Sequence, residues 1–191
     1  MGKIILGSSS PRRADILKKM KIDFEVLPSS YVEKHDRTDF SYDYVEELAY
    51  NKALYVAQEL NRNGKSFLVL GADTIVIIDN KILGKPQNQQ EAYDMLKKLS
   101  NNTHFVVTAV AIINSETMAS KIESDTTYVT FENLTENQIN YYIENYRPFD
   151  KAGAYGIQEL PQGYIKEVKG DIDNVIGLPS KVVRKLLNEM Q

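Results

Sequence analysis

The chain has 191 residues, which is long enough for one substantial core or for two small lobes that share a sheet. It is 42% hydrophobic and 26% charged, as is typical of a soluble globular protein, and its net charge of -3 lacks the basic field that non-specific nucleic-acid binding requires. Because the chain has no cysteine, disulfides, thiolate metal sites and cysteine nucleophiles are excluded.

The apolar segments do not indicate a membrane protein. The longest apolar run, residues 106–113, is too short to cross a bilayer and is interrupted by Thr108. The first residues lack the pattern of a signal peptide. We therefore expect a cytoplasmic protein with neither a membrane nor a nucleic acid as partner. A small phosphorylated ligand is still compatible with the composition, because local clusters of Lys and Arg can occur in an acidic protein.

Strands and helices are predicted to alternate in the first half of the chain. The predicted elements are a strand over 3–7, a helix over 11–21, a strand over 23–27, a polar loop over 29–41, a helix over 43–61, an apolar strand over 67–71 and a hairpin of 74–78 with 81–83. Gly64 is the expected stop of the long second helix, since glycine is favoured just after a helix ends.

Strands pair with one another in the second half. The predicted elements are a helix over 88–99, two long strands over 104–114 and 118–131, a helix from the cap Thr135 to 144, a loop over 147–161, a strand over 164–168 and a helix that Pro179 opens. This order predicts an α/β fold with a mixed sheet.

The segment from Ser8 to Arg13 follows the first strand and is a candidate anion site. Pro11 suits the first position of a helix, so Ser10 is the expected N-cap that offers its hydroxyl to a backbone N–H. Free N–H groups at a helix start favour a bound anion, and guanidinium groups such as those of Arg12 and Arg13 match phosphate oxygens. The alternative is an arginine pair on a solvated helix face.

Asp73 follows the apolar strand 67–71 in the run Gly71-Ala72-Asp73-Thr74. We expect it at the carboxyl edge of the sheet, where α/β proteins place ligands and where a carboxylate can hold a divalent cation or orient a water molecule. The alternative is a turn-forming Asp between two strands. Lys85, after Gly84, places one ammonium group on a tight turn.

The loop over 150–158 combines Lys151 and Gln158 with small residues that allow a ligand close to the backbone. The alternative is a flexible surface loop. Glu33 in the polar loop and Lys52 in the second helix are candidate charges, each of which taken alone reads as a solvated side chain. His35 and His104 lack the spacing of a zinc site.

Taken in order, these motifs resemble one protein family. The motifs are Ser8-x-Ser10-Pro11-Arg12-Arg13, Gly71-Ala72-Asp73-Thr74, Gly84-Lys85-Pro86, residues 150–158 and Gly177-Leu178-Pro179. They resemble the Maf family of nucleoside triphosphate pyrophosphatases over nearly the whole chain. The resemblance implies a single domain over 1–191 with an inosine-triphosphatase-like fold, in which an elongated mixed sheet is flanked by helices and two lobes surround a cleft.

The resemblance implies an enzyme that uses Mg²⁺ or Mn²⁺ to hydrolyse a nucleoside triphosphate between the α- and β-phosphates, releasing pyrophosphate. The implied catalytic residues are Asp73, Lys52 and Lys85, the implied metal ligands are Glu33 and Asp73, and the implied substrate-binding residues are Ser8, Ser10, Arg12, Arg13, Thr74, Lys151 and Gln158. Asp73 is either a general base or chiefly a metal ligand. A homodimer is also implied.

Arg12, Thr74 and Gln158 occupy the positions at which subtypes of the family differ, and they match the dTTP/UTP type. Modified pyrimidine nucleotides are further candidate substrates, because they would need the same pocket. Two alternatives are a 7-methyl-GTP-type enzyme of the same fold and a non-catalytic, nucleotide-binding regulator of septum formation. The chain departs from the family pattern at Glu159, at Thr108-Ala109-Val110, at Pro179-Ser180 and at 171–174, where Gly-Ser/Asp-Tyr-x-Asn is common.

Overall fold

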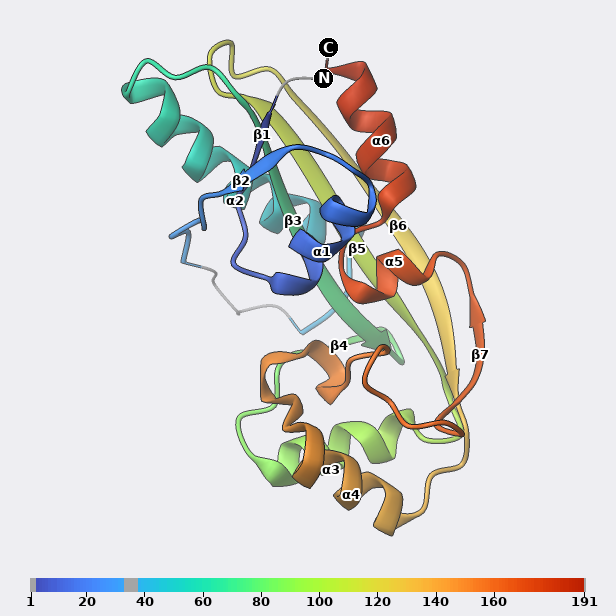
Figure 1. Ribbon diagram of the computed structural model, residues 1–191. Helices are drawn as coiled ribbons and strands as arrows, with labels where there is room; N and C mark the ends of the chain where they lie inside the picture. The colour runs from blue at the N-terminus through green and yellow to red at the C-terminus, as the bar shows by residue number, and fades with distance from the viewer. Residues whose placement is uncertain (1–2, 33–37, 191) are drawn as a thin grey trace.

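The computed structural model describes residues 3–32 and 38–190, which form an α/β fold around one mixed seven-stranded sheet (Figure 1). This confirms the predicted fold class. The strands are β1 (Ile4–Leu6), β2 (Phe24–Val26), β3 (Leu68–Ile78), β4 (Lys81–Leu83), β5 (Thr103–Asn114), β6 (Ser120–Phe131) and β7 (Ile165–Lys169). The helices are α1 (Pro11–Lys19), α2 (Tyr42–Arg62), α3 (Gln89–Leu99), α4 (Glu136–Tyr146), α5 (Ile172–Ile176) and α6 (Ser180–Glu189), with short 3₁₀ turns η1 (Pro148–Asp150) and η2 (Ala152–Ala154).

The sheet has the order β2-β1-β3-β5-β6-β7, with β4 added to β3. β1 is parallel to β2 and β3, whereas the pairs β3–β4, β3–β5, β5–β6 and β6–β7 are antiparallel. Parallel pairs need a crossover, which α1 and α2 supply, whereas short turns join the antiparallel pairs β3–β4 and β5–β6. The alternating first half and the strand-rich second half of the sequence therefore account for the mixed sheet.

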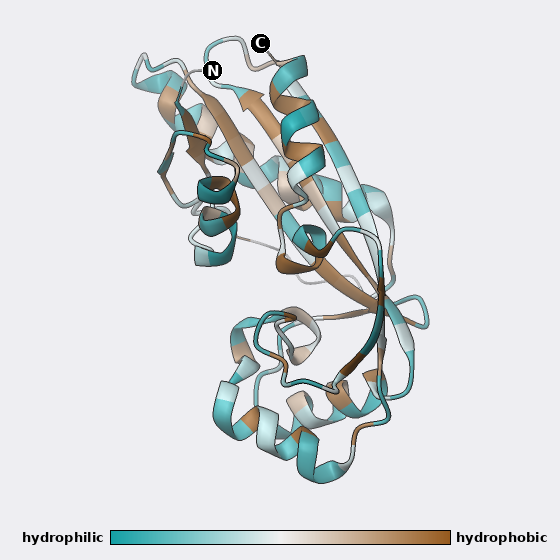
Figure 2. Cartoon of the chain, turned by 45° about the vertical axis from the view of Figure 1, so that its right-hand side comes forward, coloured by the Kyte–Doolittle hydropathy of each residue, from teal (hydrophilic) through white to brown (hydrophobic). Residues whose placement is uncertain are grey.

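Helices cover both faces of the sheet and gather into two lobes at its ends (Figure 1). In the first lobe, α1 and α6 pack on one face around Leu70 and Val110, and α2 packs on the other face around Val69. In the second lobe, α3 and α4 enclose a separate apolar cluster that includes Phe131 and Tyr142. Figure 2 shows that the most hydrophobic stretches are the central strands, whereas the outer helix surfaces are hydrophilic.

β3 is continuous from Leu68 to Ile78, so the predicted break after Gly71 is wrong. A Cβ on Gly71 would lie 2.5 Å from the Ala49 carbonyl oxygen and 2.6 Å from the Ala53 nitrogen of α2. Gly71 thus permits close packing of helix on strand and does not end the strand. Asp73 accordingly lies within a strand and not at its carboxyl end.

Two helix starts differ from expectation. Ser10 is the N-cap residue of α1 and Pro11 is its first residue, as predicted, but the Ser10 side chain makes no cap hydrogen bond. The sequence analysis also missed α5, whose cap Asp171 accepts a hydrogen bond from the Asp173 nitrogen. A helix of five residues is too short to show a 3.6-residue period.

The predicted C-terminal stop of α2 and the predicted N-cap of α4 are confirmed. The α2 helix closes at Gly64, where the nitrogens of Gly64 and Lys65 donate to the carbonyls of Asn61 and Leu60. Thr135 caps α4 through a reciprocal capping box with Gln138. Within the described part of the chain, no helix has both the length and the apolar character needed to cross a membrane.

The close contact of α2 with β3 predicts that Gly71→Ala destabilises the fold. The added methyl group would meet backbone atoms, which cannot rotate away, so we expect a loss of about 1–3 kcal/mol in the free energy of unfolding. Urea denaturation of the variant measures it. Gly84→Ala is the matched control, because a Cβ on Gly84 would have no heavy atom within 4 Å. Equal stability of the two variants would contradict the packing argument.

Candidate active site

A cleft of 760 Å³ lies between the two lobes. Of the residues that the sequence analysis singled out, those that line this cleft are Ser8, Ser10, Arg12, Arg13, Lys52, Asp73, Thr74, Lys85, Lys151 and Gln158. Glu33 and His35 lie outside the described residues. The fold thus brings together side chains from positions as far apart as 8 and 158.

The cleft lies along one edge of β3, in the interval between the two short strands β1 and β4 that pair with that edge. β1 pairs with Leu68–Leu70 and β4 pairs with Val76–Ile78, while β5 follows the opposite edge of β3 along nearly its whole length. Residues 71–75 therefore face the interval between β1 and β4. Asp73 lies beyond the carboxyl end of β1, which is the type of sheet edge expected for a ligand site, although β3 itself runs on.

Strand alternation sends Asp73 and Thr74 to opposite faces of β3. Asp73 faces α2, where Oδ1 forms an ion pair with Nζ of Lys52. The two side chains are only 15% (Lys52) and 10% (Asp73) exposed. In such a partly buried position, the opposite charges interact more strongly than on the surface and are screened less by salt.

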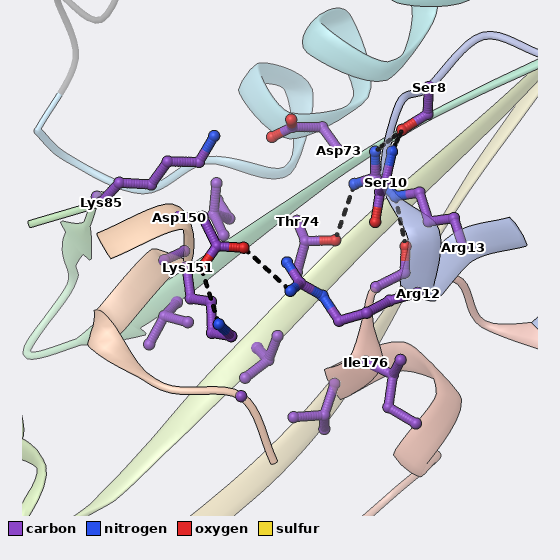
Figure 3. Close-up of a pocket in the computed structure, with 18 of the residues that line it drawn as sticks. Ser8, Ser10, Arg12, Arg13, Asp73, Thr74, Lys85, Asp150, Lys151 and Ile176 are labelled. Carbon is purple, nitrogen blue, oxygen red and sulfur yellow. Dashed lines mark hydrogen bonds and ion pairs between the residues drawn. The ribbon is translucent and has the colours of Figure 1, made fainter. Parts of the chain in front are cut away.

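Thr74 points to the other face, where α1 presents Arg13. The Arg13 guanidinium donates three hydrogen bonds: from Nε to the Gly177 carbonyl at 2.9 Å, from Nη1 to Ser8 Oγ at 3.0 Å and from Nη2 to Thr74 Oγ1 at 3.3 Å. These acceptors belong to the segment after β1, to β3 and to the residue after α5. The guanidinium is thus held in one orientation at the cleft wall (Figure 3).

Ser8 has the hydrogen-bonding capacity that an anion requires. Its Oγ accepts from Arg13 Nη1 and, at 3.3 Å, from the Ser10 nitrogen. A hydroxyl has two lone pairs and one proton, so two accepted bonds leave the O–H as its remaining capacity. Ser8 is therefore set up as a donor toward the cleft.

Arg12 extends across the cleft to the second lobe. Its Nη1 lies 3.2 Å from Asp150 Oδ2, and the other oxygen of Asp150 lies 2.8 Å from Lys151 Nζ (Figure 3). Burial raises the pKa of Asp150, but hydrogen bonds and charges of Lys151 and Arg12 outweigh it, so that the pKa is lowered. Asp150 is 62% exposed, so its pair with Arg12 adds little stability and a ligand can displace it.

Lys151 is the most buried cation of the predicted set, with a side chain that is 8% exposed. Besides Asp150, it contacts Glu159 Oε2 at 3.1 Å. The sequence analysis assigned no site role to Asp150 or Glu159. The signal available for Asp150 was its place at the start of the 150–158 motif, and for Glu159 its departure from the family pattern.

Lys85 and Gln158 are exposed at the cleft, and Lys85 enters it from the side opposite Arg12 and Arg13 in Figure 3. The turn that carries Lys85 is tied to the second lobe by a 3.0 Å hydrogen bond from the Gly153 nitrogen to the Gly84 carbonyl. Gly153 has a φ of 66°, and a Cβ there would lie 2.9 Å from Val76 Cγ1. The position therefore needs glycine.

The side chains of His104 and Tyr142, which are both buried, hold the 151–158 loop in place by hydrogen bonds. The Tyr155 hydroxyl shares a 2.7 Å hydrogen bond with His104 Nε2, and the Gly156 nitrogen donates to the Tyr142 hydroxyl at 3.1 Å. Burial raises the pKa of Tyr142 to about 12, in spite of the opposing Gly156 hydrogen bond, and also raises the pKa of Tyr155. Both phenols are thus protonated near neutral pH. Sequence reasoning missed this support because the partners are distant in the chain.

Comparison with known proteins links this chain to one family. A family model described as Maf-like protein matches residues 3–190. A protein of Clostridium novyi named dTTP/UTP pyrophosphatase is 41% identical, covering 98% of this chain and 97% of its own length. Proteins of the same name from Thermotoga maritima and Thermosipho africanus are 42% and 43% identical; they cover 98% and 97% of this chain, and 89% and 92% of their own lengths.

His104 predicts a loss of stability in mild acid. Burial lowers the pKa of His104 from 6.5 to about 4, so between these pH values the unfolded chain binds a proton that the folded chain does not. The contribution of His104 to the free energy of unfolding is complete above pH 6.5 and falls by about 3 kcal/mol as the pH drops to 4. Denaturation of His104→Gln, whose amide does not titrate, should show a smaller acid loss than the original chain. Equal losses would contradict the prediction.

Proposed function

The chain belongs to the family of Maf-like proteins, and we propose on this basis that it is a nucleoside triphosphate pyrophosphatase that acts on dTTP and UTP. The observation that carries the proposal is the grouping of Arg13, Lys52, Lys85 and Lys151 around Asp73 in one cleft of a chain with net charge -3. A triphosphate carries about four negative charges, so an acidic protein needs such a local basic site to bind it.

The reaction breaks the anhydride bond between the α- and β-phosphates. Water attacks one of the two phosphorus atoms of this anhydride, forms a new P–O bond and loses a proton. The bond from that phosphorus to the bridging oxygen breaks, and the oxygen departs with the other phosphate group. The products are a nucleoside monophosphate and pyrophosphate. This chemistry depends on positioning and on charge stabilisation more than on a covalent intermediate. The cleft supplies both through side chains held by the fold.

We assign the phosphate contacts to residues of α1, of α2, of the turn after β4 and of the segment before α1. Arg13, Lys52 and Lys85 offer positive charge to phosphate oxygens, and Ser8 and Ser10 donate hydrogen bonds near the start of α1. Arg13 is pre-oriented by hydrogen bonds to Ser8, Thr74 and Gly177, so it loses little freedom when a phosphate binds. Lys151, already paired with Asp150 and Glu159, supports the far side of the cleft.

The donor set fits a hard divalent cation bound together with substrate. Within the described ranges, 3–32 and 38–190, no group of three or more acidic or histidine side chains could hold a metal ion. Mg²⁺ commonly uses one or two carboxylates plus substrate phosphates, and Mn²⁺ accepts similar oxygen ligands. Asp73 would be a ligand of Mg²⁺ or Mn²⁺ here; Glu33, the second ligand that the family resemblance implies, lies outside the described residues. Bound there, such a cation would supply positive charge to the phosphate oxygens.

The ammonium group of Lys52 forms an ion pair with Asp73 Oδ1 and so holds this carboxylate at the cleft. A carboxylate can accept a proton from the attacking water or hold a cation. The geometry therefore supports Asp73 as the central acidic residue of the reaction in either role.

Nucleotide choice is assigned to Arg12 and Gln158, which both line the cleft. The Arg12 charge is paired with Asp150, and Gln158 is a neutral amide, so these side chains suit a base and a sugar better than a triphosphate. An amide can both donate to and accept from the edge of a pyrimidine.

Asp73→Asn should reduce pyrophosphate release from dTTP by about 10³-fold or more, because an amide neither accepts the proton nor holds the cation. Steady-state assays with Mg²⁺ and with Mn²⁺ measure the loss. Asp79→Asn is the control, since Asp79 forms an exposed ion pair with Lys98 away from the cleft. Near-normal turnover by Asp73→Asn, or no release by the unchanged chain from any canonical or modified triphosphate, would overturn the proposal.

Arg12 and Arg13 should have separable effects. Arg13→Ala should lower kcat/KM by a similar factor on every triphosphate, because phosphate contacts are common to all nucleotides. Arg12→Ala should change the ratio of kcat/KM values between pyrimidine and purine triphosphates. A panel of canonical nucleotides and 7-methyl-GTP measures both. The division is wrong if Arg12→Ala lowers all activities equally or if Arg13→Ala alters the preference.

A further inference from the structure

We propose that a buried hydrogen-bond chain from Asn174 through Thr108 to Thr74 positions Arg13 for the reaction. The proposal rests on the proposed function, in which Arg13 contacts the substrate phosphates. The chain joins α5 to β5 and β3, and it ends at the guanidinium. Asn174 and Thr108 are fully buried and do not line the cleft. Their effect on catalysis therefore passes through other residues.

The directions of these hydrogen bonds follow from counting protons. Thr108 Oγ1 lies 2.8 Å from the backbone carbonyl oxygen of Asn174. Because a carbonyl oxygen can only accept, the Thr108 hydroxyl donates its proton there. Thr108 Oγ1 lies 3.0 Å from Thr74 Oγ1. Because Thr108 has already used its one proton, Thr74 must be the donor in that bond.

Thr74 is consequently an acceptor toward Arg13. Its proton is directed to Thr108, so its lone pairs are available to Arg13 Nη2, a group that can only donate. The order of donation runs from Arg13 to Thr74, then to Thr108, and ends at the Asn174 carbonyl. Thr74 has no second proton to offer a nucleotide, so we assign its influence on the substrate to Arg13.

Asn174 also fixes α5 against the sheet. Its Oδ1 accepts from the Thr108 nitrogen at 3.0 Å, and its Nδ2 donates to the Val106 carbonyl at 2.9 Å and to Thr127 Oγ1 at 3.0 Å. The amide of one side chain thus bonds the backbone of β5 in the way that a neighbouring strand would. Such a fully satisfied buried polar network specifies one arrangement of its members.

The same helix supplies a second contact to Arg13. Gly177 follows α5, and its carbonyl accepts from Arg13 Nε. A Cβ on Gly177 would lie 3.3 Å from Thr74 Oγ1, and its φ of 122° favours glycine. Asn174 therefore controls two acceptors of one guanidinium: Gly177 through the placement of α5, and Thr74 through Thr108.

Thr108→Val tests the chain by removing the hydroxyl and keeping the shape. We expect kcat/KM to fall about tenfold on both dTTP and UTP with their ratio unchanged, because a 1 Å misplacement of a catalytic group costs roughly that much or more. Thr108→Ser, which keeps the hydroxyl, should restore activity to within about twofold. Thr103→Val is the control, since Thr103 lies on the same strand, β5, and bonds Thr130 of β6 in an exposed pair away from Arg13.

A double-mutant cycle with Arg13→Lys separates positioning from general destabilisation. If Thr108 acts through Arg13, then Thr108→Val should cost little further activity once the guanidinium is gone. Additive losses in the double variant would overturn the proposal. If Thr108→Val does not fold, Thr74→Val breaks the same chain at a half-buried residue, with Thr74→Ser as its conservative partner.

The Arg13 Nε–H signal in ¹⁵N–¹H NMR gives a readout that does not depend on activity. The signal is assigned by its loss in Arg13→Lys, and we expect it to be sharp in the original chain and broadened by exchange in Thr108→Val. An unchanged signal, or unchanged activity of Thr108→Val beside an active original chain, would overturn the positioning role. An inactive original chain in which Thr108→Val still broadens the signal would overturn the proposed function alone.

Discussion

One guanidinium joins three parts of the chain that are distant in sequence, and the active-site cleft depends on it. Arg13 bonds Ser8 after β1, Thr74 within β3 and Gly177 after α5. An arginine near a helix N-terminus is unfavourable for the helix dipole, and the first turn of α1 holds no acidic residue. The acceptors around Arg13 offset that placement. In the proposed function a bound triphosphate would offset it further, which would give the local cost to α1 a functional reason.

β3 contributes contacts on both of its faces to the site, because neighbouring residues on a strand point to opposite faces of the sheet. Asp73 meets Lys52 on the α2 face, and Thr74 meets Arg13 on the α1 face, so one dipeptide serves two charged groups. The interval between β1 and β4 exposes this dipeptide to the cleft. Across the cleft, Asp150 and Glu159 offset the charges of Arg12 and Lys151, so the two sides differ in what they attract.

Local patterns predicted the element types except for α5 and the continuous β3, and they indicated most of the residues that meet in the cleft, whereas contacts between distant residues could not be predicted. Pro11 after three serines indicated the start of α1, and the order of five short motifs indicated the family. Gly71 was misread because a glycine that admits a helix looks the same in sequence as one that ends a strand. The His104–Tyr155 bond joins residues 51 positions apart, and the Arg12–Asp150 pair joins residues 138 apart, and no periodicity reports such partners.

The most direct test of this account is a crystal structure of the protein with Mg²⁺ and a dTTP analogue whose α,β-bridging oxygen is replaced by an NH group. The account predicts that phosphate oxygens contact Arg13, Lys52 and Ser8, and that the base lies toward Arg12 and Gln158. A triphosphate bound beside Asp150 and Glu159 with the base against Arg13, or a nucleotide bound outside the cleft, would contradict it.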